Sequence, residues 1–165
     1  MQGVAAPQAY GDPRLLVPFF RLWNPALKDD FYTVSVDEKN NAIAKLGYND
    51  EGVAGYLWPN TVAQQKKTIP LYRVYNGQAG VHNHFYTTSP VERDADINNL
   101  GYANEGTAGY VYNDTLCGGL PLYRLWSARA QNEFYTMDAN EVNNVVTNDP
   151  DRYVLEKVAA WIIRF

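Results

Sequence analysis

The sequence has few of the residues that would bring in a disulfide, a membrane or a nucleic-acid backbone. Cys117 is the only cysteine, which excludes a disulfide within the chain, and such a cysteine is more often a small buried residue than a reactive thiol. No apolar run reaches the roughly eighteen residues of a membrane span. The net charge is −4 at pH 7, whereas nucleic-acid binding needs a basic surface. We therefore expect neither nucleic acid nor membrane insertion.

The first residues lack the features of a secretory signal. Residues 1–7 have neither its basic start nor its long apolar stretch. This predicts a cytoplasmic protein, one released by a non-classical route, or a chain from which a signal has been removed.

Catalytic signatures are also missing. There is no Gly-x-Ser-x-Gly elbow and no phosphate-binding loop. His82 and His84 would share one face of a strand, as a metal-binding pair does, but no third ligand accompanies them. We expect a protein that is not an enzyme and that has no metal and no cofactor.

Aromatic residues are what the chain has in quantity: 13 tyrosines, 6 phenylalanines and 4 tryptophans. A flat ring suits the apolar face of a sugar, and the frequent asparagine amides suit its hydroxyls. The same residues are common in strands and turns, so composition fits both a sugar site and a β-rich scaffold.

The sequence repeats itself three times. A Pro-x-x-Arg-x-aromatic segment, a Phe-Tyr-Thr triplet and a Glu-Gly-x-Ala-Gly-Tyr segment recur with constant internal spacing, and the last is weakened in the third copy. A period near fifty residues indicates a repeat architecture. We predict a single domain over residues 1–165, with repeats at about 17–60, 69–113 and 120–165 and an N-terminal extension over 1–16.

Each repeat reads as strand, strand, helix, strand. Residues 70–76 alternate as a strand does, with Pro70 at the entry where no ladder donor is needed. A loop leads to a second strand with the Phe-Tyr-Thr triplet, giving a hairpin. Small residues in the third strand predict the close approach of another segment.

A helix start follows the second strand in each copy. Ser35, Ser89 and Asp138 each stand three residues before a glutamate, the spacing of a capping box. We expect helices of about ten residues. They should bury the following apolar residues: Ile43, Leu46, Ile97, Leu100, Val145 and Val146.

The predicted fold is mainly β with short helices. Three strand–strand–helix–strand repeats would form a closed pseudo-threefold β assembly with helices outside, and closure would remove edge strands. The alternative is a β-trefoil, which also has three copies of this size but has no helix in each copy.

Recurring charged residues have a structural interpretation. The capping box accounts for the glutamates at 38, 92 and 141. The arginines at 21, 73 and 124 recur together with the glutamates at 51, 105 and 156, which favours ion pairs within or between copies. An arginine that lines a ligand groove is the other interpretation.

Candidate binding residues lie near the hairpin loops. A large ring ends the first strand of each copy beside the loop, and the residues before Phe-Tyr-Thr are polar. The tyrosine of each triplet has two interpretations. It is either a core residue whose hydroxyl is hydrogen-bonded or part of a solvent-exposed aromatic surface for a ligand. The predicted ligand-binding residues are Trp23, Asp30, Tyr32, Tyr75, Asn83, His84, Tyr86, Trp126, Asn132, Glu133 and Tyr135.

These motifs resemble a tandem-repeat family of fungal and bacterial proteins. Its units read Pro-Leu-Tyr-Arg-Leu-Tyr-Asn, His-Phe-Tyr-Thr-Thr-Ser, Gly-Tyr and Glu-Gly-x-Ala-Gly-Tyr, and residues 121–126, 84–92, 100–102 and 105–112 carry the likeness here. Some members are appended to secreted hydrolases, which implies a binding module for carbohydrate. The first copy has Asp30, and the third Glu133, where the family usually has histidine. Sites that depend on this position would differ in specificity.

Together these observations predict a lectin-like, non-enzymatic carbohydrate-binding protein, such as a defence lectin. Up to three related weak sites would gain strength through valency. The expected partners are glycans or glycoproteins, with homo-oligomer formation left open. The alternative is a protein-binding module, such as a protease inhibitor or a defence or interaction protein, that uses one variable loop.

Overall fold

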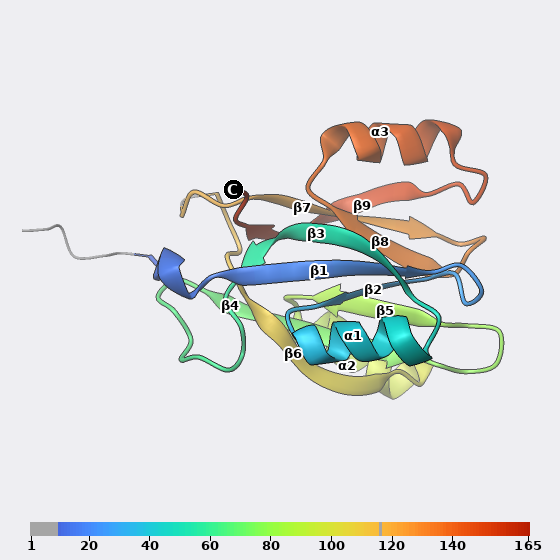
Figure 1. The fold of residues 1–165 in the computed structure, drawn as a ribbon. Helices are drawn as coiled ribbons and strands as arrows, with labels where there is room; N and C mark the ends of the chain where they lie inside the picture. The colour runs from blue at the N-terminus through green and yellow to red at the C-terminus, as the bar shows by residue number, and fades with distance from the viewer. Residues whose placement is uncertain (1–9, 116) are drawn as a thin grey trace, which may run out of the picture.

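Three similar units make up the structure, a computed structural model that describes residues 10–115 and 117–165 (Figure 1). Each unit runs strand, strand, helix, strand, as predicted. The first consists of β1 (Val17–Asn24), β2 (Asp29–Thr33), α1 (Val36–Lys45) and β3 (Asn49–Leu57). The second consists of β4 (Ile69–Asn76), β5 (Asn83–Thr87), α2 (Pro90–Leu100) and β6 (Ala103–Val111). The third consists of β7 (Leu120–Ser127), β8 (Asn132–Thr136), α3 (Ala139–Asn148) and β9 (Val154–Ile162).

The segment before β1 belongs to the predicted N-terminal extension. Residues 1–9 lie outside the described residues, and Pro13–Leu15 forms a short 3-10 turn. The Gly11 N–H donates to the Tyr112 hydroxyl at 3.1 Å, and the Trp58 indole donates to the Asp12 carbonyl at 2.7 Å. These bonds fix residues 11 and 12 to the first and second units. Among the described residues, no helix is long and apolar enough to cross a membrane.

Each unit is one antiparallel sheet with its first strand in the middle. The strand orders are β2-β1-β3, β5-β4-β6 and β8-β7-β9. The hairpin register is the same in all three, because the arginine of the middle strand always stands opposite the tyrosine of Phe-Tyr-Thr. The sequence repeats are therefore structural repeats.

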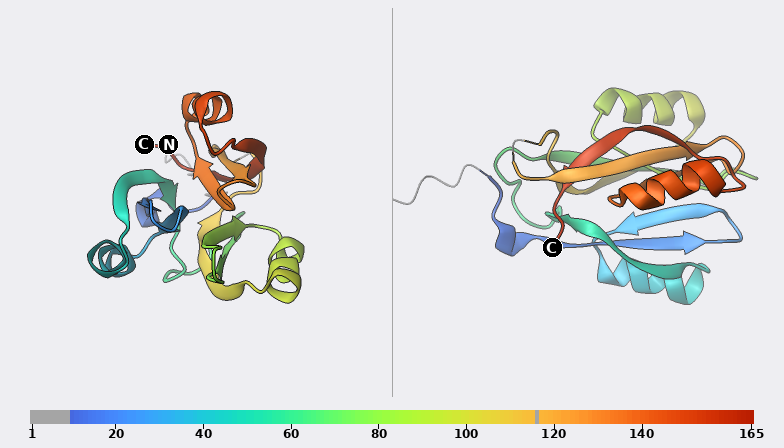
Figure 2. Two further views of the ribbon diagram at one scale, coloured as in Figure 1. Left: turned by 90° about the vertical axis from the view of Figure 1, so that its right-hand side faces the viewer. Right: turned by 90° about the horizontal axis from the view of Figure 1, so that it is seen from above.

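The second strands of the three units meet at a common axis. Every residue of β2, β5 and β8 is buried, and these strands contact one another. Figure 2 (left) shows the three units around this axis, with the helices on the outside. At the end away from the hairpin turns, single β-bridges join each unit to the next through β3, β6, β9 and the residues that follow them. The closed pseudo-threefold β assembly is confirmed. The β-trefoil alternative is wrong, because each unit is a separate sheet with its own helix.

The expected removal of edge strands is wrong. Along most of their length β3, β6 and β9 pair only with the middle strand of their own unit. Their first residues are exposed and include charged side chains such as Asp50, Glu51, Glu105 and Lys157. Charged side chains are a common protection of edge strands against pairing with other molecules.

Three tyrosines tie the inner strands together at the axis. The Tyr86 hydroxyl accepts a hydrogen bond from the Tyr32 N–H at 2.8 Å and donates one to the Tyr32 carbonyl at 2.6 Å. The Tyr135 hydroxyl does the same for Tyr86, and the Tyr32 hydroxyl for Tyr135, so the ring closes. Each hydroxyl thus satisfies the backbone polar groups on the free edge of a neighbouring strand. The three tyrosines belong to the core.

The helices begin where the capping pattern predicts. Ser35 and Ser89 accept hydrogen bonds from the N–H of the glutamate three residues later, and Asp138 does so from residues 140 and 141. The reciprocal half of the capping box is absent. A threonine hydroxyl accepts the bond from the cap amide instead, as Thr33 does for Ser35. The glutamates are therefore available for contacts with the next unit.

The prediction of which helical residues are buried is wrong for four of the six: Ile43, Leu46, Leu100 and Val146 are exposed. Ile97 and Val145 are half-buried, and the fully buried helical residues are Ala42 and Val142 instead. Each helix contacts its sheet along a narrow line, so the residues beside that line remain in solvent.

The close approach predicted for the third strands is confirmed. A Cβ atom added at Gly55 would lie 2.5 Å from Ile162 Cδ1 and 2.7 Å from the Met137 sulfur. The third strand of the first unit can therefore reach the third unit only because this side chain is missing.

We expect Tyr86→Phe to lower the free energy of unfolding by about 2–4 kcal/mol, because it leaves the N–H and carbonyl of Tyr32 buried without a partner. Urea denaturation measures the change. Tyr123→Phe, at a half-buried ring in β7, is the matched control and should cost less than about 0.5 kcal/mol. Equal losses in the two variants would contradict a special role for the tyrosine ring.

Candidate functional site

A second ring of polar contacts lies at the hairpin end of the axis. Asp29, Asn83 and Asn132 are the first residues of the inner strands and are fully buried. Asn132 Oδ1 accepts from the Asp30 N–H at 3.3 Å, and its Nδ2 donates to the Asp30 carboxylate at 2.8 Å. The equivalent pairs are Asn83 with Glu133 and Asp29 with His84.

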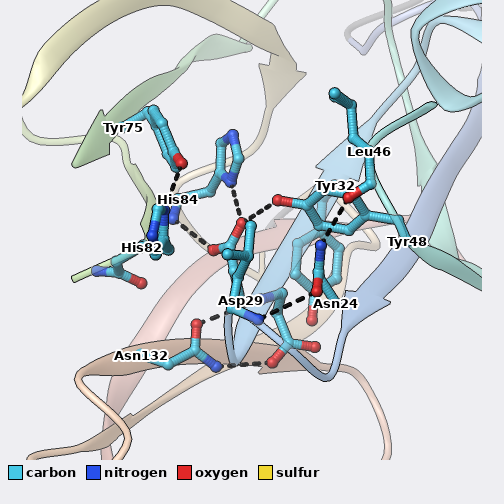
Figure 3. A network of polar contacts seen from close by, with 12 residues as sticks. Asn24, Asp29, Tyr32, Leu46, Tyr48, Tyr75, His82, His84 and Asn132 are labelled. Carbon is cyan, nitrogen blue, oxygen red and sulfur yellow. Dashed lines mark hydrogen bonds and ion pairs between the residues drawn. The ribbon is translucent and has the colours of Figure 1, made fainter. Parts of the chain in front are cut away.

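The partners in this ring are chemically matched. Where the first residue is Asp29, the partner from the next unit is an imidazole, and His84 Nδ1 lies 2.6 Å from the carboxylate (Figure 3). Where the first residue is asparagine, the partner is a carboxylate that accepts from the amide. A tyrosine after each helix adds a bond to the ring, as Tyr48 does by donating to Asp29 at 2.5 Å.

These contacts give most of the predicted binding residues a structural role. Asp30, Asn83, His84, Asn132 and Glu133 are at most 8% exposed, and they hold neighbouring units together. The polarity of these residues suggested loop positions that could bind a sugar. In the structure they are instead the first or second residue of an inner strand, and every residue of the inner strands is buried. The tyrosines of the axial ring are also buried, with at most 1% exposed: Tyr32, Tyr86 and Tyr135.

The aromatic residues at the end of the middle strands are placed differently. Trp23, Tyr75 and Trp126 are half-buried and stand opposite Asp30, His84 and Glu133 in the hairpin ladders. Tyr75 stacks on the His84 ring, with centroids 4.3 Å apart. Part of each of these three side chains remains exposed to solvent.

An arginine cluster links each pair of neighbouring units. Arg21 lies between two glutamates: its Nε is 3.0 Å from Glu51 of the same unit, and its Nη1 is 2.9 Å from Glu141 of the third unit. Its guanidinium also lies 4.4 Å from the ring centre of Phe134. Arg73 and Arg124 repeat the arrangement with their own neighbours. The interpretation of these arginines as ion-paired is confirmed.

Two clefts open beside these clusters. The first, of about 260 Å³, lies between the third and first units, and Arg21, Trp23 and Glu141 line it. The second, of about 390 Å³, lies between the first and second units, and it is lined by Arg73, Tyr75 and Glu38. Corresponding residues line both, so they are the same site made twice. We call them the inter-unit clefts.

Burial perturbs two acids beside the arginines. Burial raises the pKa of Asp30 to about 7, against the opposing charge of Arg21. It likewise raises the pKa of Glu133 to about 8. Glu92 differs from these two acids. Burial would raise its pKa, but hydrogen bonds from Arg124 and Thr87 hold that pKa at about 2.

Most charged side chains of the clefts are paired with one another. The cleft carboxylates at 51, 141, 38 and 105 are ion-paired with arginine and so are not free bases. His84 is engaged with Asp29, and His82 Nδ1 lies 3.0 Å from the Tyr75 hydroxyl. Among the described residues, no group of three or more histidine, cysteine or acidic side chains is placed to hold a metal ion.

Sequence reasoning missed two contributors to the clefts. One is the phenylalanine of Phe-Tyr-Thr, which lies under the arginine of the next unit: Phe31 under Arg73, and Phe134 under Arg21. The other is the tyrosine after each helix, at positions 48, 102 and 153. The recurrence of this tyrosine in all three copies could have marked it as important. The clefts form between units, however, and spacing within one unit does not reveal contacts between units.

We expect the Glu133→Gln variant to be more stable than the wild type at high pH, by a margin that grows as the pH rises. The raised pKa means that folded Glu133 keeps a proton that the unfolded chain releases, so the wild type loses stability between about pH 4.5 and pH 8. Glutamine keeps an acceptor for Asn83 and carries no charge. The gain in free energy of unfolding should be near zero at pH 4 and on the order of a few kcal/mol at pH 9.

Thermal unfolding from pH 4 to pH 9 tests this expectation. Asp94→Asn, at an exposed carboxylate in α2, is the control and should give a curve parallel to that of the wild type. A parallel curve for Glu133→Gln as well would contradict the raised pKa.

Comparison with known proteins gives one match. Residues 8–163 match the family model described as "Domain of unknown function (DUF5648)". No curated protein and no solved structure matches the chain. Because the model covers almost the whole chain, the protein belongs to the DUF5648 family.

Proposed function

We propose that the protein binds saccharides at the inter-unit clefts. The observation that carries this proposal is the repeated pairing of a half-buried ring with a fixed arginine–glutamate cluster. The ring offers an apolar face to a sugar, and the charged groups offer donors and acceptors to its hydroxyls.

The cleft side chains are held in place before a ligand arrives. Arg21 is fixed by Glu51, by Glu141 and by the ring of Phe134 beneath it. Arg73 is fixed in the same way by Glu105, Glu38 and Phe31. Side chains that are already ordered lose little entropy on binding, which favours recognition of a small polar ligand.

The size of the clefts suits one or two sugar rings. Volumes of about 260 and 390 Å³ lie near the lower end of ligand pockets, for which roughly 300–1,000 Å³ is usual. A small contact area gives weak binding at each cleft. A glycan with several branches that reaches more than one cleft of the same molecule would bind more tightly through valency.

The sites should differ in preference. Asp149 and Asp151 add negative charge to the cleft that contains Trp23, whereas Leu27 and Leu46 add apolar surface to the cleft that contains Tyr75. Trp126 occupies the equivalent position between the second and third units, beside Glu133. Two unequal sites would favour a mixed glycan over a homopolymer.

A glycan array with labelled protein, with and without EDTA, tests the proposal. We expect binding that EDTA leaves unchanged, because the cleft groups are arginines and glutamates in ion pairs. A blank array at high protein concentration would contradict saccharide binding. Capture of one protein partner per chain, without competition by sugars, would instead favour the protein-binding alternative.

Trp23→Ala and Tyr75→Ala test the placement of the sites. Each should weaken binding of a monovalent array ligand to its own cleft about tenfold, the loss of one stacked ring. Isothermal titration calorimetry measures the affinity. Tyr10→Ala removes an exposed aromatic ring outside the clefts and should change nothing. If all three variants bind like the wild type, the clefts are not the sites.

A further inference from the structure

The three hairpin turns form a pocket of their own. All of them lie at one end of the molecule, opposite the start of β1 and the C-terminus (Figure 1), and Figure 2 (left) views this end along the axis. Residues from all three turns line a pocket of about 440 Å³ there. It is separate from the inter-unit clefts, with which it shares only Leu27.

Equivalent positions of the three units converge on this pocket. Lys28, His82 and Gln131 each immediately precede the inner strand of their unit, and all three line the pocket. Lys28 and Gln131 share a left-handed backbone, with φ of 54° and 52°. The pocket therefore exists only when the three units have closed around the axis.

The charge of the pocket is opposite to that of the whole chain. The cations Lys28 and Arg129 line it, and none of its lining residues is acidic, although the chain carries a net charge of −4. Lys28 also pairs with Asp151 at 3.1 Å, and Arg129 donates to the Pro150 carbonyl at 3.1 Å. Both contacts are exposed, so either cation can turn to a ligand at little cost.

We propose that this axial pocket binds the anionic group of an acidic saccharide. Lys28 and Arg129 would hold a carboxylate or a sulfate group, and Gln131 would bond to a neighbouring hydroxyl. A bare anion would leave most of the volume empty, while Pro25 and Leu27 offer apolar surface for a sugar ring. The stoichiometry is one ligand per chain.

The chain itself supplies mild variants for a test. Lys28 and Gln131 are equivalent, so Lys28→Gln places at position 28 a residue that already adopts this backbone in the third unit. Arg129 is equivalent to Ala26 of the first unit, which makes Arg129→Ala similarly mild. Lys66→Gln, at an exposed lysine outside the pocket, is the control for lost charge.

The experiment is calorimetric titration of the full chain with glucuronate, glucose and inorganic sulfate at low salt. We expect glucuronate to show one site per chain that binds it at least tenfold more tightly than any site binds glucose. Lys28→Gln and Arg129→Ala should each weaken glucuronate binding about tenfold, and added salt should weaken it as well. Lys66→Gln should leave binding at this site unchanged.

Three results would overturn the proposal. Absence of glucuronate binding would remove the site. Equal affinity for inorganic sulfate and glucuronate would show that the pocket recognises an anion and not a saccharide. Binding that Trp23→Ala abolishes and Lys28→Gln leaves intact would move the ligand to an inter-unit cleft.

Discussion

The structure depends on the way in which three short strands can meet at one axis. Each inner strand pairs with one neighbour and turns its other edge toward the axis, where it would leave buried N–H and carbonyl groups without partners. The hydroxyls of Tyr32, Tyr86 and Tyr135 supply those partners in a closed ring. Because each hydroxyl serves the next unit, no single unit satisfies its own inner strand.

The layers around this ring follow the same cyclic rule. The first residue of each inner strand bonds to the second residue of the next inner strand, and each arginine pairs with a glutamate from the preceding helix. The side chain at such a position in one unit therefore complements its partner in another unit chemically, as Asp29 complements His84. At these positions the repeats differ in matched pairs: Asp29 faces an imidazole, and the two asparagines face carboxylates.

Both proposed sites are consequences of closure. The inter-unit clefts lie where a helix of one unit meets the middle strand of the next, and the axial pocket lies where the three hairpin turns meet. The clefts follow the threefold repetition. The pocket lies on the axis, where three equivalent positions carry three different side chains: Lys28, His82 and Gln131.

The sequence by itself determined the units. The Arg-to-Tyr register, the helix starts at Ser35 and Ser89 and the close approach at Gly55 are set by local patterns of alternation, capping and size. Only the tertiary structure decided which polar residues are buried. Asp30 and Glu133 look like loop ligands in the sequence and lie in the interior, because their partners Asn132 and Asn83 come from other units. Spacing within a repeat carries no record of contacts between repeats, and those contacts form the clefts, the axial pocket and the raised pKa values.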